Sequence, residues 1–115
     1  MQLEERDVGI VCVLSVLDAR MDARSSVDLK GAVSTLLGKG RSKIVLDLSR
    51  VKFVDSSGLG AVVGALKLVG SNGDFVIAGI NESVATLFRL TRMDKVFRVF
   101  PSAEDATRAL QPEGR

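Results

Sequence analysis

Residues 44–69 read IVLDLSRVKFVDSSGLGAVVGALKLV and carry the strongest pattern for a fold class. The β-branched and aliphatic run at residues 44–48 follows turn residues, a pattern typical of a short buried strand. From Ser56 or Ser57 onward, apolar residues recur at helical spacing until Gly70. The stretch therefore predicts a strand followed closely by a helix, the repeating unit of sheets with parallel strands.

Strand-like and helix-like segments alternate over the rest of the chain. Strands are expected at four further places: residues 2–5, 8–17, 75–78 and 96–100. Helices are expected at three: from Ser25, with a capping signal at residues 25–28, to a stop at residues 38–40; after the N-cap Asn81; and from Ser102 onward. The predicted order is β-β-α-β-α-β-α-β-α. We therefore expect an α/β fold with a mixed central sheet of four to five strands and helices packed on it.

The length and composition indicate one globular domain. The chain has 115 residues, so we assign residues 1–110 to a single domain and residues 111–115 to a flexible C-terminal tail. The net charge is only +2, and the aromatic residues are five Phe without Trp or Tyr. Neither a broad positive field nor a base-stacking surface is expected from this composition, and we predict no direct binding of nucleic acid.

Histidine is absent and Cys12 is the only cysteine, which removes the usual zinc ligands and the Ser-His and Cys-His nucleophile pairs. We therefore expect no enzyme activity, no cofactor and no metal. Cys12 sits in an apolar run and is expected to be a buried free thiol, in keeping with a reducing cytoplasm. Residues 8–17 follow a net acidic segment, unlike a signal peptide, and no stretch approaches the roughly 20 apolar residues of a membrane span. A cytoplasmic protein without a membrane span is the expectation.

The segment at residues 55–60, Asp-Ser-Ser-Gly-Leu-Gly, is the main candidate site because it feeds the start of the second helix. In a purely structural interpretation, Asp55, Ser56 or Ser57 caps this helix by accepting hydrogen bonds from its free amides. In a functional interpretation, the same amides and the positive end of the helix dipole tolerate a phosphate. A phosphate adds about −1.5 to −2 charges and would repel a docked partner.

Gly58, Gly60 and Gly64 form a G-x-G-x-x-x-G pattern that also suggests a nucleotide-binding turn. However, the first glycine comes about ten residues after the predicted strand, and the chain is too short for the second half of a dinucleotide fold. Small residues that let the helix pack close to the sheet are the preferred interpretation. A catalytic serine is disfavoured because there is no G-x-S-x-G elbow and no histidine base.

A second polar segment, residues 18–24, also follows a predicted strand and precedes a helix. In a parallel sheet both loops emerge at one end, where they can form a joint recognition surface. Two independent solvated turns are the alternative. The sequence leaves both arrangements open.

The segment DSSGLG, preceded by IVLDLSRVKFV and followed by AVVGALK, resembles the signature of the anti-sigma factor antagonists, the STAS-domain family. Weaker similarity runs from about residue 8 to residue 110 and includes Asp22, placed before Lys30, and a VFRVF strand near the end. The resemblance implies a STAS domain over residues 1–110. It also implies a regulatory protein that works by changing its binding partner.

In that family, the unphosphorylated protein binds an anti-sigma factor serine kinase, and a sigma factor is thereby released. The kinase uses ATP to phosphorylate the first serine of the D-S-[ST]-G motif, which is Ser56 here, and the partner then dissociates. A PP2C-like phosphatase restores the binding form. The resemblance thus implies two protein partners, the kinase and the phosphatase, and a role in bacterial transcription regulation.

Carried over residue by residue, the resemblance implies phosphorylation of Ser56 and partner contacts at Asp22, Asp55, Ser56, Ser57, Gly58, Leu59 and Gly60. One departure is Ala19, which stands where the family often has a glycine. An alternative within the family is a structural or regulatory subunit of a stressosome-like or lipid-transport complex. The sequence does not indicate an oligomeric state.

Overall fold

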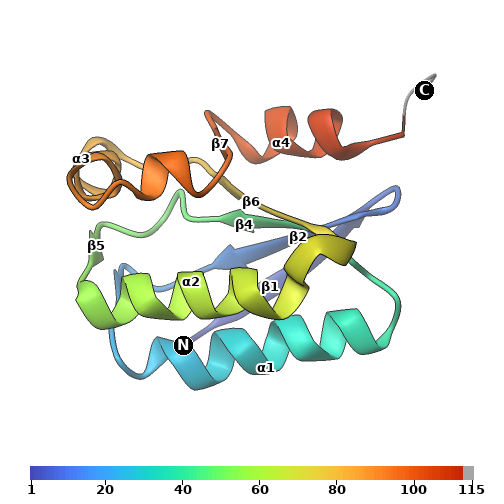
Figure 1. Ribbon diagram of the computed structural model, residues 1–115, viewed down its shortest axis with the longest axis horizontal. Coiled ribbons are helices and arrows are strands. Elements are labelled where there is room, and N and C mark those ends of the chain that lie inside the picture. The colour runs from blue at the N-terminus through green and yellow to red at the C-terminus, as the bar shows by residue number, and fades with distance from the viewer. Residues whose placement is uncertain (113–115) are drawn as a thin grey trace.

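A mixed five-stranded sheet forms the centre of the computed structural model, which describes residues 1–112 (Figure 1). Its neighbouring strands, in spatial order, are β1 (Leu3–Val8), β2 (Val11–Val16), β4 (Lys43–Asp47), β6 (Asp74–Ala78) and β7 (Val99–Phe100). The β1–β2 pair is antiparallel, and the other neighbours in this sheet are parallel. The predicted mixed sheet with alternating strands and helices is therefore confirmed.

Helices lie on both faces of this sheet. α1 (Ser25–Gly38) and α2 (Ser56–Val69) pack side by side on one face, and α4 (Ala103–Leu110) lies on the other (Figure 1). α3 (Glu82–Leu90) contributes buried side chains to the same core as α1 and α2. Right-handed crossovers explain the pairing of α1 with α2, because successive connections in one direction place their helices on one face.

The core has one part on each face of the sheet. The larger part packs α1, α2 and α3 against alternate strand residues such as Leu46 and Ile77. The smaller part joins Val45 and its neighbours to Ala106 and Leu110 of α4. Strand β4 is therefore covered on both faces, as its continuous apolar run predicts.

Two predicted strands differ from the structure. The strand expected at residues 8–17 is divided between β1 and β2, because a turn at Gly9 separates them. Gly9 has a φ of 62°, the left-handed conformation that such a tight turn favours. The strand expected at residues 96–100 is reduced to β7, because the 3₁₀ turn η2 (Met93–Lys95) precedes it and Phe97 is buried in the core.

Two further strands are too short to be recognised in the sequence. β3 (Arg20–Met21) and β5 (Phe53–Val54) pair in parallel as a separate two-stranded sheet. Two residues are too few for any alternation of apolar and polar side chains to be detected. This small sheet lies at the end of the molecule where α2 begins (Figure 1).

The structure bears on three further expectations, which concern Cys12, the C-terminal tail and membrane-spanning helices. Cys12 is a buried free thiol, as predicted, and burial raises the pKa of that thiol. Of the tail expected at residues 111–115, residues 113–115 lie outside the described residues, and Gln111 donates a hydrogen bond from Nε2 to the carbonyl of Val8 (2.7 Å). Over residues 1–112, no helix is both long and apolar enough to cross a membrane.

Leu46→Ala is expected to destabilise the fold strongly, because Leu46 lies in the central strand β4 and is fully buried. The free energy of unfolding should fall by about 2–5 kcal/mol through lost burial and the cavity left behind. Urea denaturation followed by circular dichroism measures this change. Val27→Ala, at a position that is 78% exposed on α1, is the control and should change the same quantity by less than about 0.5 kcal/mol. Equal effects would contradict the core described above.

Candidate functional site

The N-terminal end of α2 is capped by Asp55 and by neither serine. The backbone of Asp55 is extended, and its Oδ1 accepts a hydrogen bond from the amide of Gly58 at 2.8 Å. Its carbonyl accepts the amide of Leu59 at 2.9 Å. Of the residues that the capping interpretation allows, Asp55 alone therefore makes the cap in the structure.

Ser56 and Ser57 are the first two residues of α2, and both are exposed. Within residues 1–112, neither their amides nor their hydroxyl groups have a hydrogen-bond partner. Unpaired amides at the start of a helix sit at the positive end of its dipole. This end of α2 therefore offers donors to an anion without any change in the fold.

Gly58 lies directly against the backbone of Met21 in β3. A β-carbon added to Gly58 would collide with the carbonyl oxygen of Met21. The same carbonyl accepts the amide of Asp55 at 3.2 Å, and the Met21 side chain is fully buried. A glycine is therefore required at position 58 for α2 to start this close to β3.

Backbone hydrogen bonds join the two polar loops. The amides of Lys52 and Phe53 both donate to the carbonyl of Ala19, at 2.7 and 3.1 Å, beside the paired strands β3 and β5. Residues 18–24 and the segment that leads to Ser56 thus form one continuous surface. The two loops are therefore joined and are not independent turns, while recognition of a partner by their shared surface stays a prediction.

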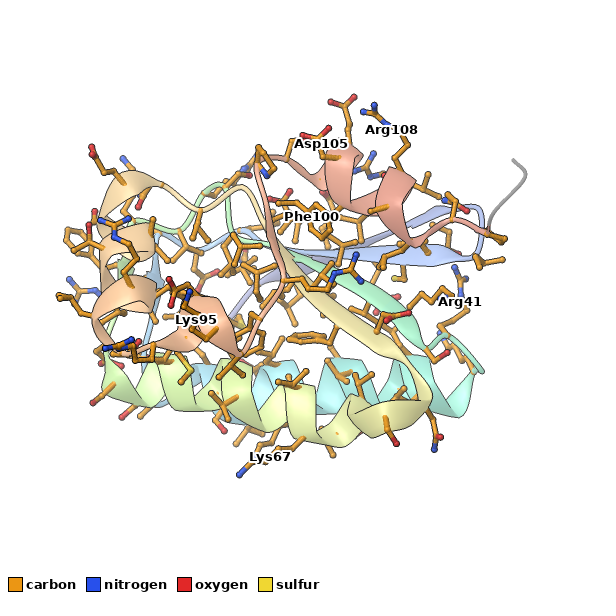
Figure 2. The ribbon with its side chains drawn as sticks, turned by 45° about the horizontal axis from the view of Figure 1, so that its top comes forward. Arg41, Lys67, Lys95, Phe100, Asp105 and Arg108 are labelled. Atoms are coloured by element: carbon orange, nitrogen blue, oxygen red, sulfur yellow. The ribbon has the colours of Figure 1, made fainter. Side chains whose placement is uncertain are left out.

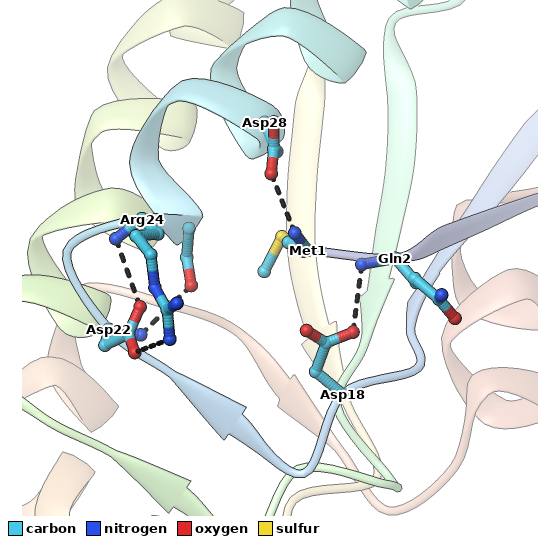
Figure 3. Close-up of polar contacts among 7 residues, drawn as sticks. Met1, Gln2, Asp18, Asp22, Arg24 and Asp28 are labelled. Atoms are coloured by element: carbon cyan, nitrogen blue, oxygen red, sulfur yellow. Dashed lines mark hydrogen bonds and ion pairs between the residues drawn. The ribbon is translucent and has the colours of Figure 1, made fainter.

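Asp22 is held in the turn that precedes α1 (Figure 3). Its amide donates to Oγ of Ser25 at 3.0 Å, and its carboxylate accepts the amide and the guanidinium of Arg24, each at 3.1 Å. The side-chain hydrogen bond from Arg24 is the main cause that lowers the pKa of Asp22. Because the Ser25 hydroxyl is engaged with Asp22, it does not cap α1, and the capping expected at residues 25–28 is wrong.

Two further contacts tie the start of β1 to this end of the molecule (Figure 3). The amino group of Met1 lies 2.8 Å from Oδ2 of Asp28, and the amide of Gln2 donates to Oδ1 of Asp18 at 2.9 Å. The loop after β2 and the first turn of α1 are therefore both attached to the first strand. The attachment limits how far the Asp22 turn can shift.

Arg20 and Phe53 form an exposed cation–aromatic pair close to Asp55. The guanidinium carbon of Arg20 lies 5.6 Å from the centre of the Phe53 ring, which is 61% exposed. Arg20 lines two surface hollows of about 330 and 260 Å³, and the smaller one also includes Phe53, Val54 and Asp55. This pair was not predicted from the sequence. The available signal was Phe53 itself, an aromatic residue between a charged side chain and the DSSG motif.

The remaining predicted site residues divide into buried and exposed ones. Leu59 is packed in the core, so its contribution to any partner surface is indirect, whereas Gly60 is exposed with open space around its α-carbon. Gly64 lies beneath the side chain of Lys30 from α1. Close packing therefore explains Gly58 and Gly64 but not Gly60. The pattern does not form a nucleotide-binding turn, because β5 lies between β4 and the start of α2.

Known proteins share this sequence pattern and this fold. Residues 4–106 match the model of the STAS domain. A Thermotoga maritima protein, provisionally named an anti-sigma factor antagonist, is 35% identical over 78 residues, which cover 67% of this chain and 69% of that one. The crystal structure of an anti-sigma factor antagonist from Mycobacterium paratuberculosis has a TM-score of 0.84 at 25% identity and covers 96% of this chain and 94% of that one.

A more distant structural neighbour is the Bacillus cell fate determinant SpoIIAA in its phosphorylated form. Its TM-score is 0.72 at 18% identity, with 96% of this chain and 100% of that one covered. At this identity the likeness concerns the fold alone. It shows that the order of strands and helices described above is that of a SpoIIAA-like α/β domain.

Gly58→Ala is expected to lower the free energy of unfolding by about 1–3 kcal/mol, because the new methyl group would overlap the Met21 carbonyl. Gly60→Ala is the matched control in the same helix. It meets open space and should raise the free energy of unfolding by about 0.5–1 kcal/mol, since alanine favours the helix. Urea denaturation of both variants measures the two signs. Destabilisation by both would argue against the close contact at position 58.

Arg24→Gln is expected to raise the pKa of Asp22 toward its ordinary value, because the charged hydrogen bond is removed. A carboxyl group with a lowered folded-state pKa stabilises the fold above its unfolded pKa, and this contribution disappears as the pH falls through the folded value. NMR titration of the carboxyl carbon measures the change. The pKa of Asp7, which is lowered by Arg41, is the internal control and should stay where it is. An unchanged Asp22 pKa would rule out the pairing.

Proposed function

Because the chain belongs to the STAS domain family, among the anti-sigma factor antagonists, we propose that it is a partner switch controlled by phosphorylation. The unphosphorylated form binds an anti-sigma factor serine kinase, and a sigma factor is released. Phosphorylation of Ser56 abolishes this binding, and a PP2C-like phosphatase reverses it. The proposed setting is the bacterial cytoplasm, and the chain itself is proposed to be a substrate and not an enzyme.

The position of Ser56 carries this proposal. Its hydroxyl is exposed and makes no hydrogen bond within residues 1–112, so a kinase and a phosphatase can both reach it. The helix cap comes from Asp55, and therefore a phosphate on Ser56 does not remove an interaction that the fold needs. The unpaired amides at the start of α2 are placed to donate hydrogen bonds to phosphate oxygens.

The charges around the N-terminal end of α2 support release of the partner after phosphorylation. Phosphorylation adds about −1.5 to −2 charges at one point of a surface that includes the Asp22 and Asp55 carboxylates and the exposed ring of Phe53. A partner docked there has to remove water from the new charge and meets its repulsion. If the phosphate costs about 3 kcal/mol of binding, the affinity falls roughly a hundredfold.

The choice of Ser56 over Ser57 rests on the family motif, in which the first serine is the acceptor. Both hydroxyls are exposed, and the geometry alone treats them equally. SpoIIAA is known in phosphorylated and unphosphorylated forms, which supports the idea that a domain of this fold accommodates a phosphate. A direct measurement on this chain has to separate the two serines.

Incubation with the cognate kinase, ATP and Mg²⁺, followed by mass spectrometry, is the test. We expect one phosphate on Ser56 in the wild-type chain and in Ser57→Ala, and none in Ser56→Ala. Calorimetric titration with the kinase should show that Ser56→Ala binds as the wild type does. Ser56→Asp should bind roughly a hundredfold more weakly, since it keeps a negative charge at the helix start.

The two alanine variants also control for folding. Neither serine side chain has a partner in residues 1–112, so both variants should unfold with wild-type free energies to within about 0.5 kcal/mol. Phosphate on Ser57 alone would reject Ser56 as the acceptor. Unchanged kinase binding after full phosphorylation would reject the switch itself.

A further inference from the structure

Residues 89–99 form a surface that is both cationic and apolar, here called the 89–99 surface. The segment holds four cations and one acid, namely Arg89, Arg92, Lys95, Arg98 and Asp94. None of the four cations forms an ion pair with any residue in the range 1–112. Three aliphatic side chains among them are exposed by 78%, 51% and 37%: Leu90, Val96 and Val99.

This surface is preformed by the core beneath it. The buried ring of Phe97 packs against Phe88 and Phe75, with centres 6.0 and 6.4 Å apart. Arg92 has a φ of 63°, a left-handed conformation that reverses the chain after α3, and its carbonyl accepts the amide of Lys95 at 3.2 Å. The exposed aliphatic groups therefore stand on an ordered helix end, turn and strand, and need no rearrangement before they meet a partner.

We propose that the 89–99 surface docks an acidic protein segment that carries apolar side chains. Exposed aliphatic groups gain free energy when they are buried against other apolar groups. Arg89 donates a hydrogen bond to Oγ1 of Thr86, and the guanidinium of Arg98 lies over the Phe100 ring, but neither contact neutralises the positive charge. Cations without an ion-pair partner within residues 1–112 select carboxylates, which form charge-assisted hydrogen bonds with them. The two properties occur on the same few residues, so a single segment with both features satisfies them together.

An anionic membrane or a nucleic acid fits the 89–99 surface less well than an acidic protein segment does. An anionic bilayer is best bound by one amphipathic helix with a continuous apolar face, whereas these aliphatic groups are spread over the end of α3, the turn before β7 and β7 itself. A nucleic acid offers phosphates to the cations, but the segment exposes no aromatic ring for base stacking, since Phe97 is buried. The mixture of aliphatic and cationic side chains favours a protein segment.

The 89–99 surface is proposed as a second docking site in addition to the switch at Ser56. The N-terminal end of α3 is the end attached to the loop before β5, because Nδ2 of Asn81 donates to the carbonyl of Val51 at 3.1 Å. Leu90 is at the other end of this helix, about 13 Å along its axis. In Figure 2, Lys95 projects from this region, while Lys67 projects from α2 at the lower edge of the molecule. The pair Lys67 and Leu68 therefore supplies a matched control surface.

The test is an NMR titration of the full chain, labelled with ¹⁵N, against a short synthetic peptide of Glu with Leu at helical spacing. We expect saturable shift changes at residues 89–99 that weaken as salt is raised. The same peptide with Lys in place of Glu should produce none. Absence of shifts at residues 89–99 with the acidic peptide, or equal shifts with the basic one, would overturn the proposal.

Two double variants make the test specific. Leu90→Ser with Lys95→Glu should weaken peptide binding by about tenfold or more, because it removes one aliphatic group and reverses one charge. Leu68→Ser with Lys67→Glu makes the same chemical change on α2 and should alter binding by less than about twofold. Ser56→Asp should leave binding of the acidic peptide unchanged, because position 56 lies outside the 89–99 surface. Equal losses in both double variants, or tighter binding to phosphatidylglycerol vesicles or to a DNA duplex, would reject this occupant.

Discussion

The contact between Gly58 and the Met21 carbonyl sets the geometry of the candidate site. It lets the first turn of α2 rest on β3, and the pairing of β3 with β5 then brings the Asp22 turn beside the segment that ends at Ser56. Each loop alone would be a solvated turn with many conformations. Here the carbonyls of Ala19 and Met21 accept hydrogen bonds from the loop that leads to Ser56. The two loops therefore form one surface whose shape does not depend on a bound partner.

The elements that could be predicted from the sequence are those in which apolar residues recur at a regular spacing. β4 and α2 each carry several apolar residues at one spacing, so their type and approximate ends follow from the pattern. The pair β3 and β5 could not be predicted, since each is two residues long and forms only when distant loops meet. The serine at the helix start was visible in the sequence, whereas the role of Gly58 depends on a neighbour 37 positions away in the chain, at Met21.

Charge is distributed unevenly although the whole chain is close to neutral. The outer strand β1 consists mostly of charged, exposed residues, which protects the free edge of the sheet from pairing with other chains. At the opposite edge, the segment that leads into β7 is cationic and partly apolar. The net charge of +2 therefore includes two sheet edges that differ in charge and in exposed apolar surface. We expect recognition by this protein to depend on local charged groups and not on an overall electrostatic field.

The division of roles between Asp55 and Ser56 has an evolutionary consequence. Asp55 holds the helix start, and Ser56 contributes no hydrogen bond to the described part of the chain. Selection can therefore alter the residue at position 56 without a stability penalty that would need compensation elsewhere. For the switch proposed above, this means that a descendant that loses the hydroxyl keeps the same scaffold and becomes a permanently active binder in a single mutational step.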